Sequence, residues 1–255
     1  MKTIDVIGLP VAATTYAGAI KWIFEHARKA DRAYGVEAAS SHVPALARHD
    51  KEFAEVMAKF SLICPDGMPV MWSVNRGLPK AEKLTDRVYG PTLMLKTIEA
   101  SEEEADLKHF FLGGSESTLE KLKSRFSKEN PGAQVVGVYS PPFREWSEQD
   151  LQDMFDAIRN SGANLIWVGL GCPKQERWIA DNLEKLPAGC YFGIGAAFAF
   201  HAGEVDQAPE FFQKRGLEWL YRLYKEPKRL WKRYFLYNSL FIYYTFRKVT
   251  SIIKK

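Results

Sequence analysis

The feature that most constrains the fold is a unit of strand, turn and helix that recurs in the second half of the chain. An apolar strand at residues 109–112 meets Gly113 and Gly114, and a helix and a second strand follow up to residue 140. Residues 147–183 repeat this order, and a further strand and turn begin at residue 190. Strands joined through helices need crossover connections, so the pattern predicts a parallel sheet that helices cover on both faces.

The first half of the chain fits the same fold class. Residues 3–30 indicate a strand, a turn and a helix with apolar residues at helical spacing. A strand, a serine-rich turn and one or two helices are expected between residues 34 and 60, followed by a short buried strand at 62–65. A helix that Pro91 could open comes next. We therefore predict an α/β fold with a Rossmann-like parallel sheet flanked by helices.

Several polar or glycine-rich segments fall at the predicted carboxyl ends of these strands. They are Asp66, the Gly113 and Gly114 turn, residues 171–175 and residues 195–197. Ligands of open parallel sheets bind beyond the carboxyl ends of the strands. The sequence therefore predicts that the site lies at this edge.

Asp66 stands between Pro65 and Gly67 at the end of an apolar run. Apolar surroundings raise the pKa of a carboxyl group, which suits a general base. The alternative is an Asp-Gly turn that faces water, which is common in proteins. The residues alone leave both interpretations open.

Two other segments could bind a substrate. Gly113 and Gly114 would let the backbone approach a diphosphate at a helix N-terminus, but a plain tight turn explains them equally well. Lys174, Gln175 and Glu176 follow Pro173 at the start of a predicted helix. They could reach a sugar or a phosphate, or they could be a solvated first turn.

The C-terminal segment differs from the rest in charge and aromatic content. Residues 213–255 hold twelve Lys and Arg and two acids, a net charge of +10, which leaves −6 for the rest of a chain that carries +4. Residues 234–246 contain no charge and seven aromatic residues. As a helix this run is roughly 20 Å long, too short for a bilayer core of ~30 Å.

We expect a Rossmann-like domain over residues 1–210 and a membrane-associating appendage over residues 211–255. The alternative is a helix that docks on the protein's own core or on a neighbouring subunit.

Composition and motifs argue against several other classes. Three widely spaced cysteines form neither a disulfide framework nor a zinc pattern and favour a reducing cytoplasm. The N-terminus lacks the apolar region of a signal peptide, and no stretch of 18 apolar residues exists. No group of His, Cys and Asp has metal-ligand spacing. We expect a cytoplasmic protein, peripheral on the inner face of the cell membrane, with no metal or other cofactor.

Taken together, these segments resemble the WecG/TagA/CpsF glycosyltransferases. The resemblance runs in the same order from about residue 4 to residue 236, and it rests on "PDGMPV", "DRVYGPTLM", "FFLGGSESTLEKL", "VGLGCPKQERWI", "GIGAAFAFHAGEVDQAPEF" and "GLEWLYRLYKEPKRLWKRY". It implies a Rossmann-like domain with a membrane-targeting C-terminal appendage. The implied activity is inverting transfer of a hexosyl residue from a UDP-sugar to a polyprenyl-diphosphate-linked sugar, without a required metal, in cell-surface or exopolysaccharide synthesis.

The resemblance also implies roles for single residues. Asp66 would deprotonate the acceptor hydroxyl, and Arg87 and Gln175 would line the sugar-nucleotide pocket. Ser40 and Glu176 fall beside these positions and join the expected substrate-binding set.

In the C-terminal segment, Arg222 and Arg229 would contact the diphosphate of a substrate. Lys232 stands where the family often has a third basic residue. The implied partners are thus a UDP-sugar donor, a lipid-linked acceptor and an anionic membrane surface.

The chain departs from the family pattern at positions near the expected pocket. Ala38 and Ser40 replace a usual Thr and Asn, and Ala199 stands where an Asp is usual. These changes count against UDP-N-acetylmannosamine itself as the donor, and an N-acetylmannosamine-like sugar, a uronic acid or another hexose stays open.

Two other function classes stay open, namely a nucleotide-binding regulator without transferase activity and a nucleic-acid-binding protein that uses the basic tail. Backbone phosphate binding does not need a long uncharged aromatic run, so we expect no nucleic acid partner. A homo-oligomer remains open.

Overall fold

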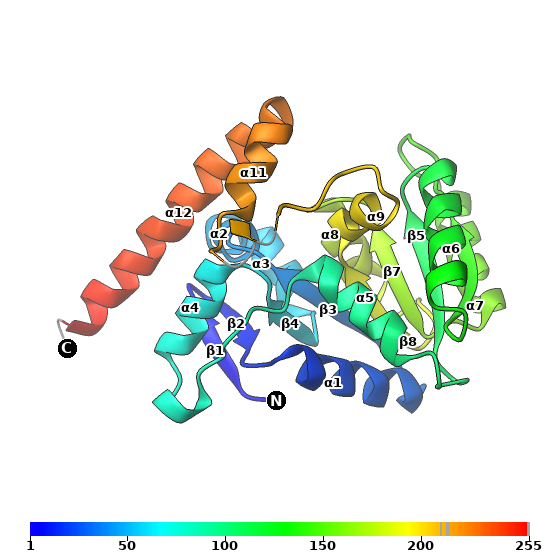
Figure 1. Cartoon of the computed structure of the whole chain (residues 1–255), viewed down its shortest axis with the longest axis horizontal. Coiled ribbons are helices and arrows are strands. Elements are labelled where there is room, and N and C mark those ends of the chain that lie inside the picture. The colour runs from blue at the N-terminus through cyan, green and yellow to red at the C-terminus, as the bar shows by residue number, and fades with distance from the viewer. Residues whose placement is uncertain (210, 213–214, 254–255) are drawn as a thin grey trace.

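One six-stranded sheet forms the centre of the molecule (Figure 1). The computed structural model describes residues 1–209, 211–212 and 215–253, and the side chains of residues 229, 232, 233 and 248–253 lie outside the description. The strands of this sheet are β3 (Ala33–Ala39), β4 (Leu62–Pro65), β5 (Lys108–Gly113), β6 (Gln134–Tyr139), β7 (Leu165–Gly169) and β8 (Gly189–Gly193). Their order is β4-β3-β8-β7-β5-β6, and every neighbouring pair is parallel. The predicted α/β fold is therefore confirmed.

Helices connect these strands, and a small hairpin precedes them. The hairpin pairs β1 (Thr3–Val6) with β2 (Leu9–Ala12) in antiparallel orientation. The α-helices are α1 (Tyr16–Lys29), α2 (His42–His49), α3 (Lys51–Ala58), α4 (Met68–Arg76), α5 (Gly90–Ala100), α6 (Glu116–Glu129), α7 (Glu148–Ser161), α8 (Lys174–Asn182), α9 (Gly195–His201), α11 (Glu218–Lys225) and α12 (Pro227–Ile253). A short 3-10 helix spans Lys80–Glu82.

Local sequence signals explain where several helices begin. Ser115 caps α6 by accepting a hydrogen bond from the backbone N–H of Thr118 at 3.1 Å. Ser147 and Asp150 form a reciprocal capping box at the start of α7. Two helices were not expected. α4 begins directly after the Asp66 turn, and residues 195–201 form α9 instead of a turn.

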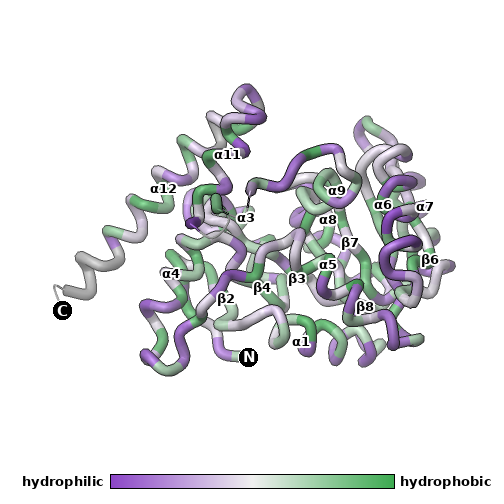
Figure 2. The backbone as a smooth tube through the Cα atoms, viewed as in Figure 1, coloured by the Kyte–Doolittle hydropathy of each residue, from purple (hydrophilic) through white to green (hydrophobic). Residues whose placement is uncertain are grey.

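Each face of the sheet carries its own apolar layer. One layer joins residues of α1, α5, α6 and α9 to one face, and the other joins residues of α3, α7, α8 and the hairpin to the opposite face. Figure 2 shows hydrophobic residues in the central strands and hydrophilic residues along the outer side of α6. Trp167 of β7 and Phe192 of β8 stack with ring centroids 3.9 Å apart inside one layer. Burial on both faces fits strands that read as continuous apolar runs.

The last helix packs on the body of the protein and then projects away from it (Figure 1). Phe241 is buried in the core layer that also contains residues of α2 and α3. The Ser41 hydroxyl donates to Asn238 Oδ1 at 2.8 Å and ties α12 to the turn after β3. Three aromatic side chains of α11 and α12 are strongly exposed, namely Tyr224, Phe235 and Phe246.

Candidate active site

A cavity of about 650 Å³ lies at the carboxyl edge of the sheet, beneath α11 and α12. Its lining comes from the segments that follow β3, β4, β7 and β8, which are neighbours in the sheet, and from the two C-terminal helices. Its position agrees with the rule that open parallel sheets bind ligands beyond the carboxyl ends of their strands. This cavity is the candidate active site.

Asp66 lines the cavity directly after β4. Its backbone N–H donates to the Ala39 carbonyl at 3.2 Å, which holds the turn against β3. Its Oδ2 accepts a hydrogen bond from the Gly90 N–H at 3.3 Å, at the start of α5. Burial raises the pKa of the Asp66 carboxyl to about 7, although the neighbouring Arg87 guanidinium favours the charged form. The group can therefore take up or release a proton near neutral pH.

Arg87 lies beside Asp66 and carries a partner from the C-terminal segment. Its Nη2 donates to Glu218 Oε2 at 2.5 Å, and both residues are buried. Its guanidinium carbon lies 4.5 Å from the centroid of the Tyr89 ring. The first residue of α11 thus contacts the arginine that the sequence placed in the pocket.

Arg222, one turn further along α11, also lines the cavity. Its guanidinium carbon is 5.2 Å from the centroid of the Phe200 ring. Its Nε atom is buried and has no hydrogen-bond partner among the described residues. A buried guanidinium nitrogen without a partner is a donor available to an anionic ligand.

Gln175 joins two of the strand-end turns. Its Oε1 accepts hydrogen bonds from the N–H groups of Gly171 and Gly195, each at 3.1 Å. Its Nε2 donates to Glu176 Oε1 at 2.9 Å. A Cβ at Gly195 would lie 2.5 Å from Gln175 Oε1, so this contact requires glycine. Gln175 and Glu176 line the cavity as expected, and the Gln175 amide also fixes the geometry of its floor.

The Gly113 and Gly114 turn is not among the segments that line the cavity. β5 is separated from β8 and β3 by β7, so its end lies to one side of the site. Gly113 has φ +108, and a Cβ there would lie 2.6 Å from the Gly169 carbonyl oxygen. Both observations favour the tight-turn interpretation over a phosphate contact.

The positions that depart from the family pattern all face the cavity. Ala38, Ser40 and Ala199 belong to its lining. Arg229 and Lys232 lie in α12, but their side chains are outside the described part of the chain.

The structure also brings residues to the cavity that sequence reasoning missed. Glu37, His42, Tyr89 and Glu218 all line it, and all four are buried. The sequence feature that could have identified Glu37 is an acidic residue in the middle of an apolar strand. For Glu218 it is an acidic residue in a strongly basic segment. A buried charge costs free energy unless it is paired and hydrogen-bonded, so buried acids at a cavity are candidates for a functional role.

His42 is the first residue of α2 and lines the cavity. Its ring packs edge-on against Tyr237 of α12 with centroids 4.5 Å apart, and its Nδ1 lies 3.7 Å from Cys172 Sγ. It therefore links the turns after β3 and β7 to the last helix.

Among the described residues, no group of three or more His, Cys, Asp or Glu side chains is placed to hold a metal ion. Among the same residues, no helix is both long enough and apolar enough to span a bilayer.

Comparison with known protein families finds one family that matches nearly the whole chain. The model of the glycosyl transferase WecG/TagA/CpsF family matches residues 4–254, nearly the whole chain. The match includes every residue of the cavity lining described above. The chain therefore belongs to the WecG/TagA/CpsF family of glycosyltransferases.

Proposed function

We propose that the protein transfers a hexosyl residue, with inversion and without a metal ion, from a UDP-sugar to a polyprenyl-diphosphate-linked sugar. The product serves the synthesis of a cell-surface polysaccharide. One observation carries this proposal: Asp66, with a pKa of about 7, shares a cavity with Arg87 and Arg222 in a chain of a glycosyltransferase family.

The proposed reaction uses Asp66 as the general base. Its carboxylate takes the proton of the acceptor hydroxyl while that oxygen forms a bond to the anomeric carbon of the donor sugar. The bond from this carbon to the UDP oxygen breaks, and UDP leaves with the bonding electrons. Attack from the face opposite the leaving group inverts the anomeric carbon. A positioned base of this kind contributes about 10²- to 10⁴-fold to a rate.

The leaving UDP needs positive charge, because its diphosphate gains a negative charge as the bond breaks. Arg222 offers a guanidinium whose buried Nε has no hydrogen-bond partner within the described chain. Arg87 adds a second cation at the same cavity. The N-termini of α5 and α8, whose first residues lie at this edge, contribute partial positive charge.

The donor sugar is proposed to differ from N-acetylmannosamine. Ala38, Ser40 and Ala199 replace larger or charged residues of the family pattern, and all three line the cavity. A hexose whose substituents need fewer polar partners, or a uronic acid, fits such a lining better.

A donor screen tests the function. Purified protein is incubated with a panel of radiolabelled UDP-sugars and with native membranes as the acceptor source. We expect one UDP-sugar to transfer label to the lipid fraction, and Asp66→Asn to abolish the transfer. Protein that binds UDP but consumes no UDP-sugar with any lipid acceptor would instead indicate a nucleotide-binding regulator.

We propose that residues 211–255 form an appendage that brings the domain of residues 1–210 to the inner face of the cell membrane. Tyr224, Phe235 and Phe246 are exposed by 82%, 75% and 67% on helices rich in Lys and Arg. Exposed aromatic rings beside basic residues suit the interface of an anionic bilayer.

Sedimentation with vesicles of phosphatidylglycerol and phosphatidylcholine tests this placement. We expect the double variant Phe235→Ser/Phe246→Ser to lose most vesicle binding, because it removes apolar area from the appendage. Phe143→Ser is the matched control, since Phe143 is 86% exposed but lies in the loop between β6 and α7. Equal binding by both variants would remove the appendage as the membrane contact.

A further inference from the structure

The ion pair between Arg87 and Glu218 connects the two parts of the chain inside the candidate site. Arg87 precedes α5, and Glu218 is the first residue of α11. Their side chains are 10% and 6% exposed, which makes this the most buried ion pair within the described chain. Glu218 is also one of only two acids in a segment of +10.

A buried ion pair is poor evidence for a purely structural role. The desolvation of two charges offsets most of their attraction, and an apolar pair of similar volume often holds two elements together as well. The position of Glu218 therefore calls for an electrostatic explanation. Asp66 is the candidate for its effect, because the Asp66 carboxyl interacts electrostatically with both members of the pair.

Six titratable groups of the described chain interact electrostatically with the Asp66 carboxyl. Arg87 and Tyr89 precede α5, Glu218 and Arg222 belong to α11, Tyr16 to α1 and Cys64 to β4. Burial raises the pKa of Tyr16 to about 12 and raises the pKa values of Tyr89 and Cys64, so these three stay neutral near pH 7.

The charged neighbours of Asp66 act in opposite directions. After burial, which raises its pKa, Arg87 and Arg222 favour the carboxylate and Glu218 opposes it. Among the described groups, Glu218 is thus the negative charge that counters the two arginines at the base. Without it, Arg87 would act on Asp66 at full strength.

We propose that Glu218 is a positioning residue, which holds Arg87 against Tyr89 and offsets its charge so that Asp66 keeps its affinity for a proton. This inference rests on the proposed function, since it assigns Asp66 the role of base. A base that is made too acidic takes a proton from a hydroxyl poorly. Docking of α11 therefore brings both Arg222 for the leaving group and Glu218 for the base.

The titration of Asp66 tests the proposal without any substrate. The carboxyl carbon of Asp66 is followed by ¹³C NMR as a function of pH in the full-length protein and in Glu218→Gln. We expect the midpoint to fall by about one pH unit, since a nearby like charge is removed and Arg87 loses its partner. An unchanged midpoint in the folded variant overturns the proposal.

The pH–rate profile gives a second readout. With the UDP-sugar identified by the donor screen, the acid limb of kcat/KM should move to lower pH in Glu218→Gln, and the plateau should drop several-fold. Glu218→Asp keeps the charge, so its acid limb should stay close to that of the parent. Asp206→Asn is the matched control. It removes an exposed carboxylate that pairs with Lys225 of the same helix, α11, at 3.6 Å. A shift of equal size in this control contradicts the proposal.

A second pair of variants keeps the test open if Glu218→Gln does not fold. Arg87→Met and Arg87→Met/Glu218→Met are compared by the same NMR titration, since the double variant removes both charges of the pair and leaves neither partner unpaired. A lower Asp66 midpoint in the double variant supports the proposal, and equal midpoints overturn it. Equal Asp66 midpoints would refute this inference alone, whereas an active Asp66→Asn variant would refute the proposed function.

Discussion

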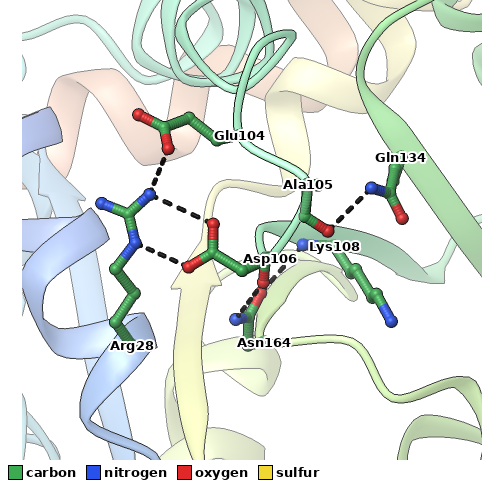
Figure 3. Close-up of polar contacts among 7 residues, drawn as sticks. All are labelled: Arg28, Glu104, Ala105, Asp106, Lys108, Gln134 and Asn164. Atoms are coloured by element: carbon green, nitrogen blue, oxygen red, sulfur yellow. Dashed lines mark hydrogen bonds and ion pairs between the residues drawn. The ribbon is translucent and has the colours of Figure 1, made fainter.

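The two edges of the central sheet use the same residue types to opposite effect. At the amino edge, Arg28 pairs with Asp106, at 2.7 Å from its Nε, and with Glu104 (Figure 3). At the carboxyl edge, Arg87 pairs with Glu218 beside Asp66. The first cluster is open to water, and the second is closed beneath α11.

Access to water explains why the pKa values of the Asp66 and Asp106 carboxyl groups shift in opposite directions. The hydrogen bond from Arg28 lowers the pKa of Asp106, because it stabilises the carboxylate and burial opposes it only weakly at this exposed position. Burial raises the pKa of Asp66 to about 7 even though Arg87 is near. The comparison teaches that a cation beside an acid does not decide its protonation, since access to water has the larger effect here.

Catalysis is where the two edges should differ most. Asp66→Asn should fold and lose about 10²- to 10⁴-fold in kcat/KM, because the amide cannot accept the hydroxyl proton. Asp106→Asn, the matched change at the amino edge, should stay within about twofold of the parent. Both are measured by transfer of label from the UDP-sugar. Similar losses in the two variants would show that the carboxyl edge holds no special base.

Stability should respond to pH in opposite directions at the two edges. The pKa of Asp66 is raised from an unfolded value near 4 to about 7, so its ionisation weakens the fold as pH rises through that window. Asp66→Asn should therefore match the parent below pH 4 and be more stable at pH 8. The upper bound is roughly 4 kcal/mol, the equivalent of about three pKa units.

Denaturant unfolding at pH 4 and pH 8 measures this difference. The expected gain in stability, together with the loss of activity, is typical of a group kept for function at a cost to the fold. A variant that is less stable than the parent at pH 8 would mean that the Asp66 carboxylate is better satisfied than its burial indicates.

The smallest effect is expected at the amino edge. The pKa of Asp106 is lowered, so its contribution to stability is present above its unfolded pKa and is lost as pH falls through the folded value. Asp106→Asn should lower the free energy of unfolding at pH 7 by about 0–1 kcal/mol, since exposed ion pairs contribute little. The loss should shrink in 1 M salt, and a salt-independent loss would indicate a buried role.

Much of the fold was predictable because its signals are local. Apolar runs of strand length, with the turns and helices between them, predicted the parallel sheet. The same logic placed Asp66 and Gln175 at the edge where the cavity lies. Residues 195–201 were missed as a helix, because seven residues are too few to show a clear helical period.

Local patterns could not predict which of the strand ends line the cavity together, since the order of strands in the sheet is not written in any single segment. Gly113 and Gly114 end a strand as Asp66 does, yet β7 stands between them and the cavity. Glu218 lies 152 positions beyond Asp66 in the numbering and meets its neighbour Arg87 only when α11 docks.

The sequence by itself determined the parallel α/β architecture, the edge at which the candidate site lies and the contrast between a mildly acidic body and a basic C-terminal segment. The tertiary structure decided which strand ends are neighbours, which charges are removed from water and therefore how Asp66 is protonated. The reason is that backbone pattern follows from nearby residues, whereas hydration and charge pairing depend on contacts between distant ones.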